Sequence, residues 1–155
     1  AILEGIQKSP EKKNLFRVLA SGVGSGAFCV LFGGTAGDAL AALLTGLLLY
    51  LVILYPLRRP MSKIVQNLLC GAFVAGCAVG FTRLGLGENL DAVIGGSIVP
   101  LVPGLAFTTG IRDIGNQDYI SGAVRMLDAL LTIFSVALGV GLTISFLHRL
   151  VGGIL

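Results

Sequence analysis

The chain has 155 residues, of which 55% are hydrophobic and only 12% are charged, whereas soluble domains usually carry about 25% charged residues. A chain of this length has too little interior to bury so much apolar surface, so we predict a membrane protein with lipid as its solvent. The net charge of +3 comes without a basic stripe that carries interleaved aromatic residues, so no nucleic-acid partner is expected.

Charged residues divide the chain into five uncharged windows, each close to the roughly 20 residues that cross the hydrocarbon core as a helix. The windows cover residues 18–37, 39–57, 64–82, 92–111 and 129–147. We therefore predict an all-α membrane protein with five transmembrane helices, forming a single membrane domain over residues 1–155. Residues 1–14 are expected to be a cytoplasmic lead-in, with Ser9 as N-cap and Pro10 at the first helical position. Because the chain begins at Ala1 and not at Met, an upstream soluble region is expected to be absent from it.

The basic residues favour a cytoplasmic N-terminus and an outside C-terminus. In this N-in, C-out orientation nine of the eleven basic residues lie in the cytoplasm, as the positive-inside rule requires. The nine are Lys8, Lys12, Lys13, Arg17, Arg58, Arg59, Lys63, Arg112 and Arg125. Only Arg83 and Arg149 are left outside.

Small residues recur on two of the predicted helices. They are Gly22, Gly24 and Gly26 on the first helix, and Ala72, Gly76 and Gly80, at four-residue spacing, on the third. Between helices in lipid no hydrophobic effect acts, and small residues allow the backbones to approach closely. We interpret both sets as helix-packing surfaces.

Three cysteines, Cys29, Cys70 and Cys77, fall inside predicted helices, where they act as small hydrophobic residues. His148 is the one histidine in the sequence, so no set of zinc ligands can be assembled and neither a metal nor another cofactor is expected. The segment "YPLRRPMSK" is expected to close a cytoplasmic hairpin, with Tyr50 and Tyr55 near the lipid headgroups.

The window 92–111 is interrupted by Pro100, Pro103 and Gly104. The two prolines are its ninth and twelfth residues, which predicts a break in the fourth helix close to the bilayer midplane. Each proline removes a backbone donor, and the glycine frees the chain to turn. Such a break is either a tight kink or a polar site, because unpaired backbone inside a membrane needs protein or water around it. Transporters use discontinuous helices to bind charged substrate groups.

A block of polar residues follows the break. Its members are Arg112, Asp113, Asp118, Ser121, Gly122, Arg125 and Asp128. Asp128 follows Arg125 by three residues, so the two are expected to pair on one helical face. The block forms either solvated interfacial pairs or a cytoplasmic gate, and a gate would require the charges to face the helix bundle.

The stretches "LVPGLAFTTGIRDIGNQDYISGAVR" and "FGGTAGD" resemble the threonine/serine exporter family of the ThrE type, in its first membrane half. The matching positions are Leu101 to Gly104, Thr108, Ile111 to Asp113, Asp118, Ser121, Gly122, Arg125 and, upstream, Phe32, Gly33, Gly34 and Asp38. The sequence departs from the family at Thr109, where members often have Asn, and at Gln117, where they often have Gly.

The resemblance implies a secondary transporter that exports threonine and serine from a bacterial cell across the inner membrane, driven by the proton gradient. It also implies a second five-helix half, on the same or a separate chain. An odd number of spans independently indicates such an inverted copy, a common plan in transporters. Membrane lipid and a small amino acid or carboxylate are the other expected partners, and a homo-oligomer is left open.

Within this interpretation the residues fall into two groups. The expected substrate-binding residues are Pro103, Gly104, Thr108, Thr109 and Arg112. The expected coupling or gating residues are Asp38, Asp113, Asp118, Ser121, Arg125 and Asp128. The amides that begin the second half-helix would bind the carboxylate and a threonine would bind the substrate hydroxyl. An aspartate such as Asp38, Asp113 or Asp118 would bind the ammonium or carry a proton.

Two other functions compete with amino-acid export. A related branch of the family is associated with export of dicarboxylates such as succinate, and a structural membrane subunit that assembles a partner transporter half is the second alternative. An enzyme is not expected. Asp38 in "TAGD" resembles part of an intramembrane aspartyl protease motif, but Thr35 stands where that motif has glycine, and no second element exists.

Overall fold

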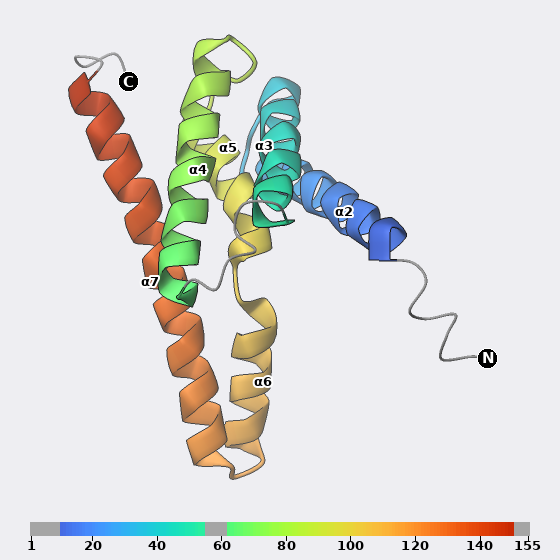
Figure 1. Ribbon diagram of the computed structural model, residues 1–155, viewed down its shortest axis with the longest axis vertical. Helices are drawn as coiled ribbons and strands as arrows, with labels where there is room; N and C mark the ends of the chain where they lie inside the picture. Colours follow the sequence, from blue (N-terminus) through green and yellow to red (C-terminus); the bar gives the residue numbers. More distant parts are fainter. Residues whose placement is uncertain (1–9, 55–61, 151–155) are drawn as a thin grey trace. The chain divides into compact units, whose positions relative to one another are not determined.

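The computed structural model describes residues 10–54 and 62–150, and all regular structure in these two ranges is helical (Figure 1). The all-α prediction is therefore confirmed for the described chain. The helices are α2 (Pro10–Leu31), α3 (Ala36–Leu54), α4 (Lys63–Arg83), α5 (Leu90–Ile98), the 3-10 turn η2 (Val99–Leu101), α6 (Gly104–Gly115) and α7 (Tyr119–Leu150). Ser9, Tyr55 and the prolines of "YPLRRPMSK" lie outside the described residues, so the predictions made for them are not assessed.

Four of these helices are long and apolar enough to cross a membrane: α2, α3, α4 and α7. The segments Leu90–Leu101 and Gly104–Gly115 form a bent pair, which counts as a fifth span if the two are taken together. The interruption lies where Pro100, Pro103 and Gly104 predicted it. Length and composition thus give four spans, or up to five.

One compact unit contains α2, α3, α5 and the last turns of α4. Here α2 and α3 approach closely at glycines: a β-carbon built on Gly22 would lie 2.7 Å from Cγ of Leu47, and one built on Gly26 would lie 3.1 Å from the carbonyl oxygen of Ala39. Gly24 has no neighbour within 4 Å in the described chain. The predicted glycine packing on the first helix is therefore confirmed at two of its three positions.

The other compact unit contains most of α4 together with α6 and α7. The backbones of α4 and α7 touch at Gly71, where an added β-carbon would lie 2.5 Å from the carbonyl oxygen of Val136, and at Gly139, which lies against Leu68. By contrast, Gly76 and Gly80 face open space within the described residues. The predicted packing ridge on α4 is therefore wrong at these two positions, because the contact uses the neighbouring helix face.

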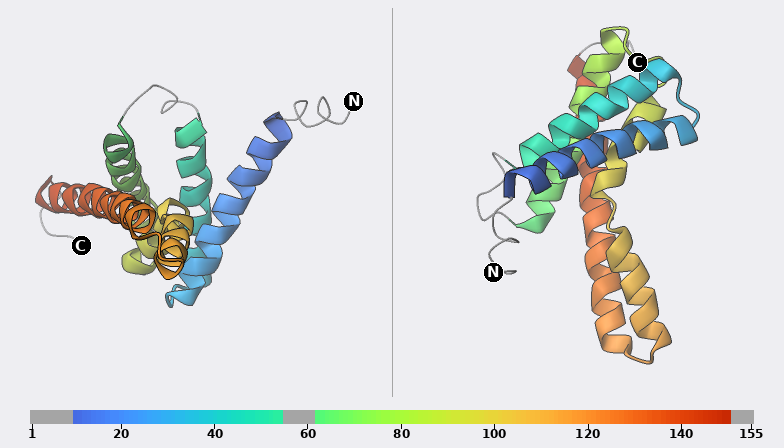
Figure 2. Two further views of the ribbon diagram at one scale, coloured as in Figure 1. Left: turned by 90° about the horizontal axis from the view of Figure 1, so that it is seen from below. Right: turned by 90° about the vertical axis from the view of Figure 1, so that its right-hand side faces the viewer.

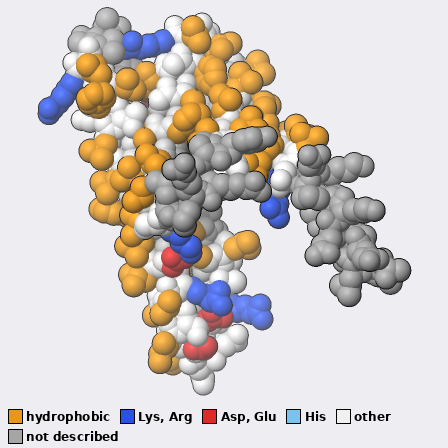
Figure 3. Space-filling model, in the orientation of Figure 1, with side chains coloured by type: hydrophobic (Ala, Val, Ile, Leu, Met, Phe, Trp, Pro, Cys, Tyr) orange, Lys and Arg blue, Asp and Glu red, His pale blue; other side chains and the backbone are white. Residues whose placement is uncertain are grey.

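Much of the face drawn in Figure 3 is apolar, and its visible acidic side chains lie with basic ones toward the end of the view where α6 and α7 meet. Other basic side chains appear elsewhere on this face. Figure 1 and the right-hand view of Figure 2 show these two helices side by side as an antiparallel hairpin. The three cysteines lie in α2 and α4 as predicted, with Cys29 and Cys70 buried and Cys77 half-buried.

Candidate substrate site and charged hairpin

The interruption between η2 and α6 is built by one tight turn. Pro103 has φ −79° and ψ 58°, and the N–H of Gly104 donates to the carbonyl oxygen of Val102 at 2.8 Å, which is the geometry of an inverse γ-turn. Pro103 is the N-cap of α6 and provides no side-chain cap. The first amides of α6 therefore lack the side-chain acceptor that normally satisfies a helix start.

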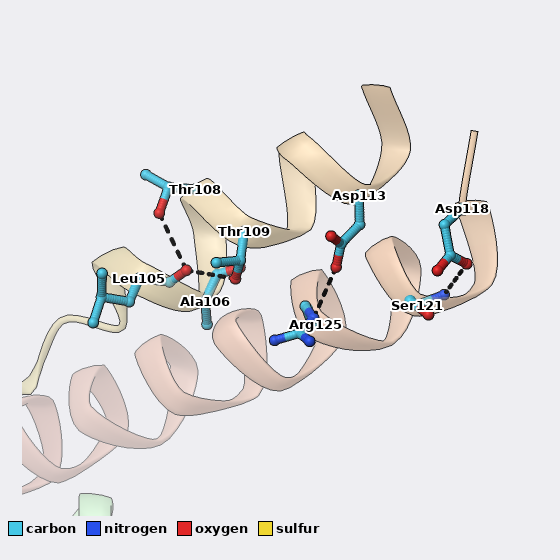
Figure 4. Close-up of polar contacts among 8 residues, drawn as sticks. All are labelled: Leu105, Ala106, Thr108, Thr109, Asp113, Asp118, Ser121 and Arg125. Carbon is cyan, nitrogen blue, oxygen red and sulfur yellow. Dashed lines mark hydrogen bonds and ion pairs between the residues drawn. The ribbon is translucent and has the colours of Figure 1, made fainter. Parts of the chain in front are cut away.

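Thr108 and Thr109 lie on the first turns of α6, and both hydroxyls donate back to their own helix. Thr108 Oγ1 lies 3.1 Å from the carbonyl oxygens of Gly104 and Leu105, and Thr109 Oγ1 lies 2.6 Å from that of Leu105 (Figure 4). Their protons are used within the helix, so each oxygen is left as an acceptor. A substrate hydroxyl that binds here must therefore donate its own proton.

The α6 and α7 helices are joined by an ion pair that the sequence did not predict. Arg125 Nε lies 2.8 Å from Asp113 Oδ2, and Lys63 Nζ on α4 lies 3.6 Å from Asp128 Oδ2 (Figure 4 shows the first pair). The predicted pair of Arg125 with Asp128 is wrong, because the hairpin brings a carboxylate of the facing helix closer than the one three residues along. Asp113 is half-buried and its partner Arg125 is exposed, as are both members of the other pair, so each pair contributes only about 0.2–1 kcal/mol.

Arg112 is exposed on α6, next to the ion pair but not part of it. In residues 14–54 and 62–150, whose side chains the structure describes, Lys63 and Arg125 are the basic residues that form salt bridges. The Arg112 guanidinium is thus available to an anion from solution, with five donors in a planar fork that suits a carboxylate.

The turn between α6 and α7 explains the remaining polar residues. Gln117 has φ 67°, a left-handed conformation that glycine adopts without strain, and family members often have glycine at this position. Asp118 then caps α7, because its Oδ1 accepts from the N–H of Ser121 at 3.3 Å. A β-carbon on Gly122 would lie 2.9 Å from the carbonyl oxygen of Gly110, so the two helices also touch at their glycines.

Asp38 lies in the other compact unit, where its side chain is fully buried. One carboxylate oxygen accepts from the N–H and the hydroxyl of Thr35 at 2.8 and 2.9 Å, and the other accepts from the N–H groups of Glu88 and Asn89 at 2.7 and 3.0 Å. Asp38 thus joins the start of α3 to the segment before α5. Its predicted role in coupling or gating stays a prediction.

Sequence reasoning missed several of these contacts, although some left a signal. Thr35 and Asp38 form a T-x-x-D pattern, which is a capping box, and this signal was readable in the sequence. The hydroxyls of Ser25 and Ser97 are buried and have no partner in the described chain, and no pattern in the sequence marks them.

The apolar helices identify the general class of the protein. An all-helical chain with four or five apolar spans, one of them interrupted, is a multi-pass membrane protein. Comparison with protein families matches residues 1–147 to the family described as "Putative threonine/serine exporter". The chain belongs to this family, which confirms the resemblance read from its motifs and supports a role in transport, not an enzyme class. No curated protein and no solved structure matched the chain.

Proposed function

We propose that this chain is one of two membrane halves of a secondary exporter for threonine and serine, driven by the proton gradient across a bacterial inner membrane. The observation that carries the proposal is the family match, which extends over residues 1–147. The interrupted helix pair adds support, since discontinuous helices are a common feature of substrate sites in transporters.

The proposed topology has five spans with the N-terminus in the cytoplasm, and the contacts of α4 with α7 support the odd number of spans. Lys63 at the start of α4 pairs with Asp128, and Gly71, eight residues later, meets Val136, which follows Asp128 by eight. The two helices therefore run in the same direction. The third and fifth spans of a five-span chain must do so.

In the proposed site the start of α6 at Pro103 and Gly104 and the side chain of Arg112 bind the substrate carboxylate. The oxygen of Thr108 or Thr109 accepts the proton of the substrate hydroxyl. The coupling or gating group comprises the Asp113–Arg125 pair, Asp118 and Ser121 at the turn, Asp128 and Asp38. Its proton carrier is one of the aspartates.

Arg112→Ala is expected to lower efflux of labelled L-threonine and L-serine at least tenfold at matched membrane abundance. A charge-assisted hydrogen bond contributes about 1.5–3 kcal/mol, and each 1.4 kcal/mol corresponds to a factor of ten. Arg83→Ala is the control, because it removes an equal charge from the other end of the α4 span. Loss of succinate efflux alone would move the substrate to the dicarboxylates. If Arg112→Ala left every flux unchanged, Arg112 would be an interfacial anchor, and the structural-subunit alternative would lead.

Proton coupling is tested by two variants that break the same ion pair. In everted vesicles, Asp113→Asn is expected to lower proton-driven threonine uptake severalfold because it removes the titratable group. Arg125→Gln breaks the pair but keeps the carboxylate, so uptake is expected to persist with a changed pH dependence. Equal loss in both variants would mean that the pair only holds the hairpin together, and the coupling role of Asp113 would be abandoned.

The proposed partner is a second five-helix half, on the same chain or another. Only 17% of the most apolar window of α7 is buried within the chain, so most of this helix needs lipid or protein around it. The hydrophobic effect does not drive helices together in lipid. Small residues let their backbones pack closely and so stabilise the association.

A further inference from the structure

The length of α4 matches the thickness of the hydrocarbon core of a membrane. The helix has 21 residues and carries Lys63 at its first position and Arg83 at its last. At 1.5 Å per residue it is about 31 Å long, which matches the hydrocarbon core of about 30 Å. Two basic residues exactly at the ends of an apolar helix are expected at the two membrane surfaces. The level of Lys63 therefore marks one edge of the hydrocarbon.

The helix α7 runs past that edge. Two contacts fix its register on α4: the Lys63–Asp128 ion pair and, eight residues further on both helices, the approach of Gly71 to Val136. Asp128 is thus level with Lys63. Residues 119–127 precede Asp128 and extend beyond the start of α4, as Figure 1 shows. These nine residues project about 14 Å at 1.5 Å per residue.

The register of α6 on α7 gives the level of the break. Gly110 lies against Gly122 and Met126, and Asp113 pairs with Arg125, so the two helices run in opposite directions. Because the helices are antiparallel, a step toward the start of α6 corresponds to a step toward the end of α7. Counted in this way from the three contacts, Gly104 is level with about Leu131. Leu131 is three residues beyond Asp128, so the break lies within about 5 Å of the Lys63 level.

We infer that the break at Pro103 and Gly104 lies at the cytoplasmic edge of the hydrocarbon, and that α6 and the first turns of α7 form a hairpin in the headgroup layer and water. The cytoplasmic side, and the role in recognition that follows, rest on the proposed function. This position differs from the midplane expected from the window 92–111, because that count assumed one straight helix that ends at Arg112. It also means that the fourth crossing is made by Leu90–Leu101 alone, about 18 Å of helix, and not by the bent pair taken together.

The charges of the hairpin agree with this level. Five charged residues fall between positions 112 and 128: Arg112, Asp113, Asp118, Arg125 and Asp128. A charged residue at the centre of a membrane helix costs at least about 2.5–3.5 kcal/mol, so these charges favour a position in the headgroup layer and water over one in the hydrocarbon. The substrate carboxylate therefore meets Arg112 at the mouth of the exporter, before it enters the membrane.

The depth of the break can be measured with spin labels in the full chain, reconstituted in phospholipid vesicles. Single cysteines replace Leu105, Leu131 or Leu138 in a background whose native cysteines are changed to alanine and whose melting temperature is unchanged. All three leucines are exposed in the chain, at 83%, 45% and 41%. Depth is obtained from collision rates with oxygen and with a water-soluble nickel complex. Leu105→Cys is expected at the depth of Leu131→Cys, and Leu138→Cys about 10 Å deeper.

A label at Leu105 that is as deep as the one at Leu138 would return the break to the midplane and overturn the inference. Ile111→Cys provides a second measurement on α6, at a position that is 59% exposed and outside the proposed site. It is expected to lie shallower than Leu131→Cys, and a deeper position would also overturn the inference. The depths do not depend on transport, so a failed efflux experiment and a failed depth experiment are distinguishable.

Discussion

Asp38→Ala is expected to lower the free energy of unfolding by about 3–5 kcal/mol. The buried carboxylate accepts four hydrogen bonds, from the N–H and hydroxyl of Thr35 and from the N–H groups of Glu88 and Asn89. Bonds to a charged acceptor contribute roughly 1.5–3 kcal/mol each, and water replaces part of this at the exposed Glu88 and Asn89. The measurement is thermal unfolding in detergent by circular dichroism at a fixed scan rate.

The matched control is Glu88→Gln. This variant also removes one negative charge, but it keeps the backbone N–H that donates to Asp38. The side chain of residue 88 is exposed. Its effect on stability is expected to stay within about 0.5 kcal/mol, as for other surface changes. Equal melting temperatures for Asp38→Ala and Glu88→Gln would show that the four bonds do not stabilise the fold.

Asp38→Asn separates the structural role of this residue from its predicted role in coupling. The amide keeps one oxygen for Glu88 and Asn89 but places an NH2 group where Thr35 now donates. A structural Asp38 therefore gives an intermediate loss of stability, with transport falling in proportion to the folded fraction. A coupling Asp38 gives a stable protein that no longer couples transport to protons. These two outcomes assign the residue.

The sequence was sufficient to predict those features that depend on local pattern. The charge-free runs 39–57 and 64–82 lie close to the bounds of α3 and α4, because a charge inside lipid is costly whatever its neighbours are. Two prolines with a glycine located the break for the same local reason, since Pro103 removes a donor in any context. Even the cap at Thr35 was readable from four residues.

Contacts between distant residues were not predictable in this way. No pattern around Asp38 marked its contacts with backbone groups 50 and 51 residues away, which only the packing of the helices brings together. Arg125 pairs across the hairpin and not along its own helix for the same reason. The small residues on α4 show why spacing alone does not predict a contact. The spacing of Gly76 and Gly80 marked one face of the helix, but Gly71 on the neighbouring face contacts Val136 of α7.

Gly139→Ala is expected to destabilise the contact of α4 with α7 by about 1–3 kcal/mol, the usual cost of forcing one extra carbon into a packed interior. A β-carbon at this position would overlap the carbonyl oxygen of Leu68 and lie 3.0 Å from the backbone nitrogen of Ala72. Both are backbone atoms of a helix and cannot rotate away, so the two helices must separate. The measurement is the melting temperature in detergent, with fluorescent labelling of buried Cys70 on α4 as a local probe.

Gly141→Ala is the matched control, because it makes the same chemical change two residues further along α7, where nothing lies within 4 Å in the described chain. Alanine favours a helix over glycine by about 1 kcal/mol, so this variant is expected to be as stable as the native protein or more so. Gly139→Ala gains the same helix propensity and still loses stability if α4 touches it. A native melting temperature and an unreactive Cys70 in Gly139→Ala would mean that the two helices do not meet there. The level of Asp128 on α4, and with it the depth inferred for the break, would then rest on the ion pair with Lys63 and the approach of Gly71 to Val136.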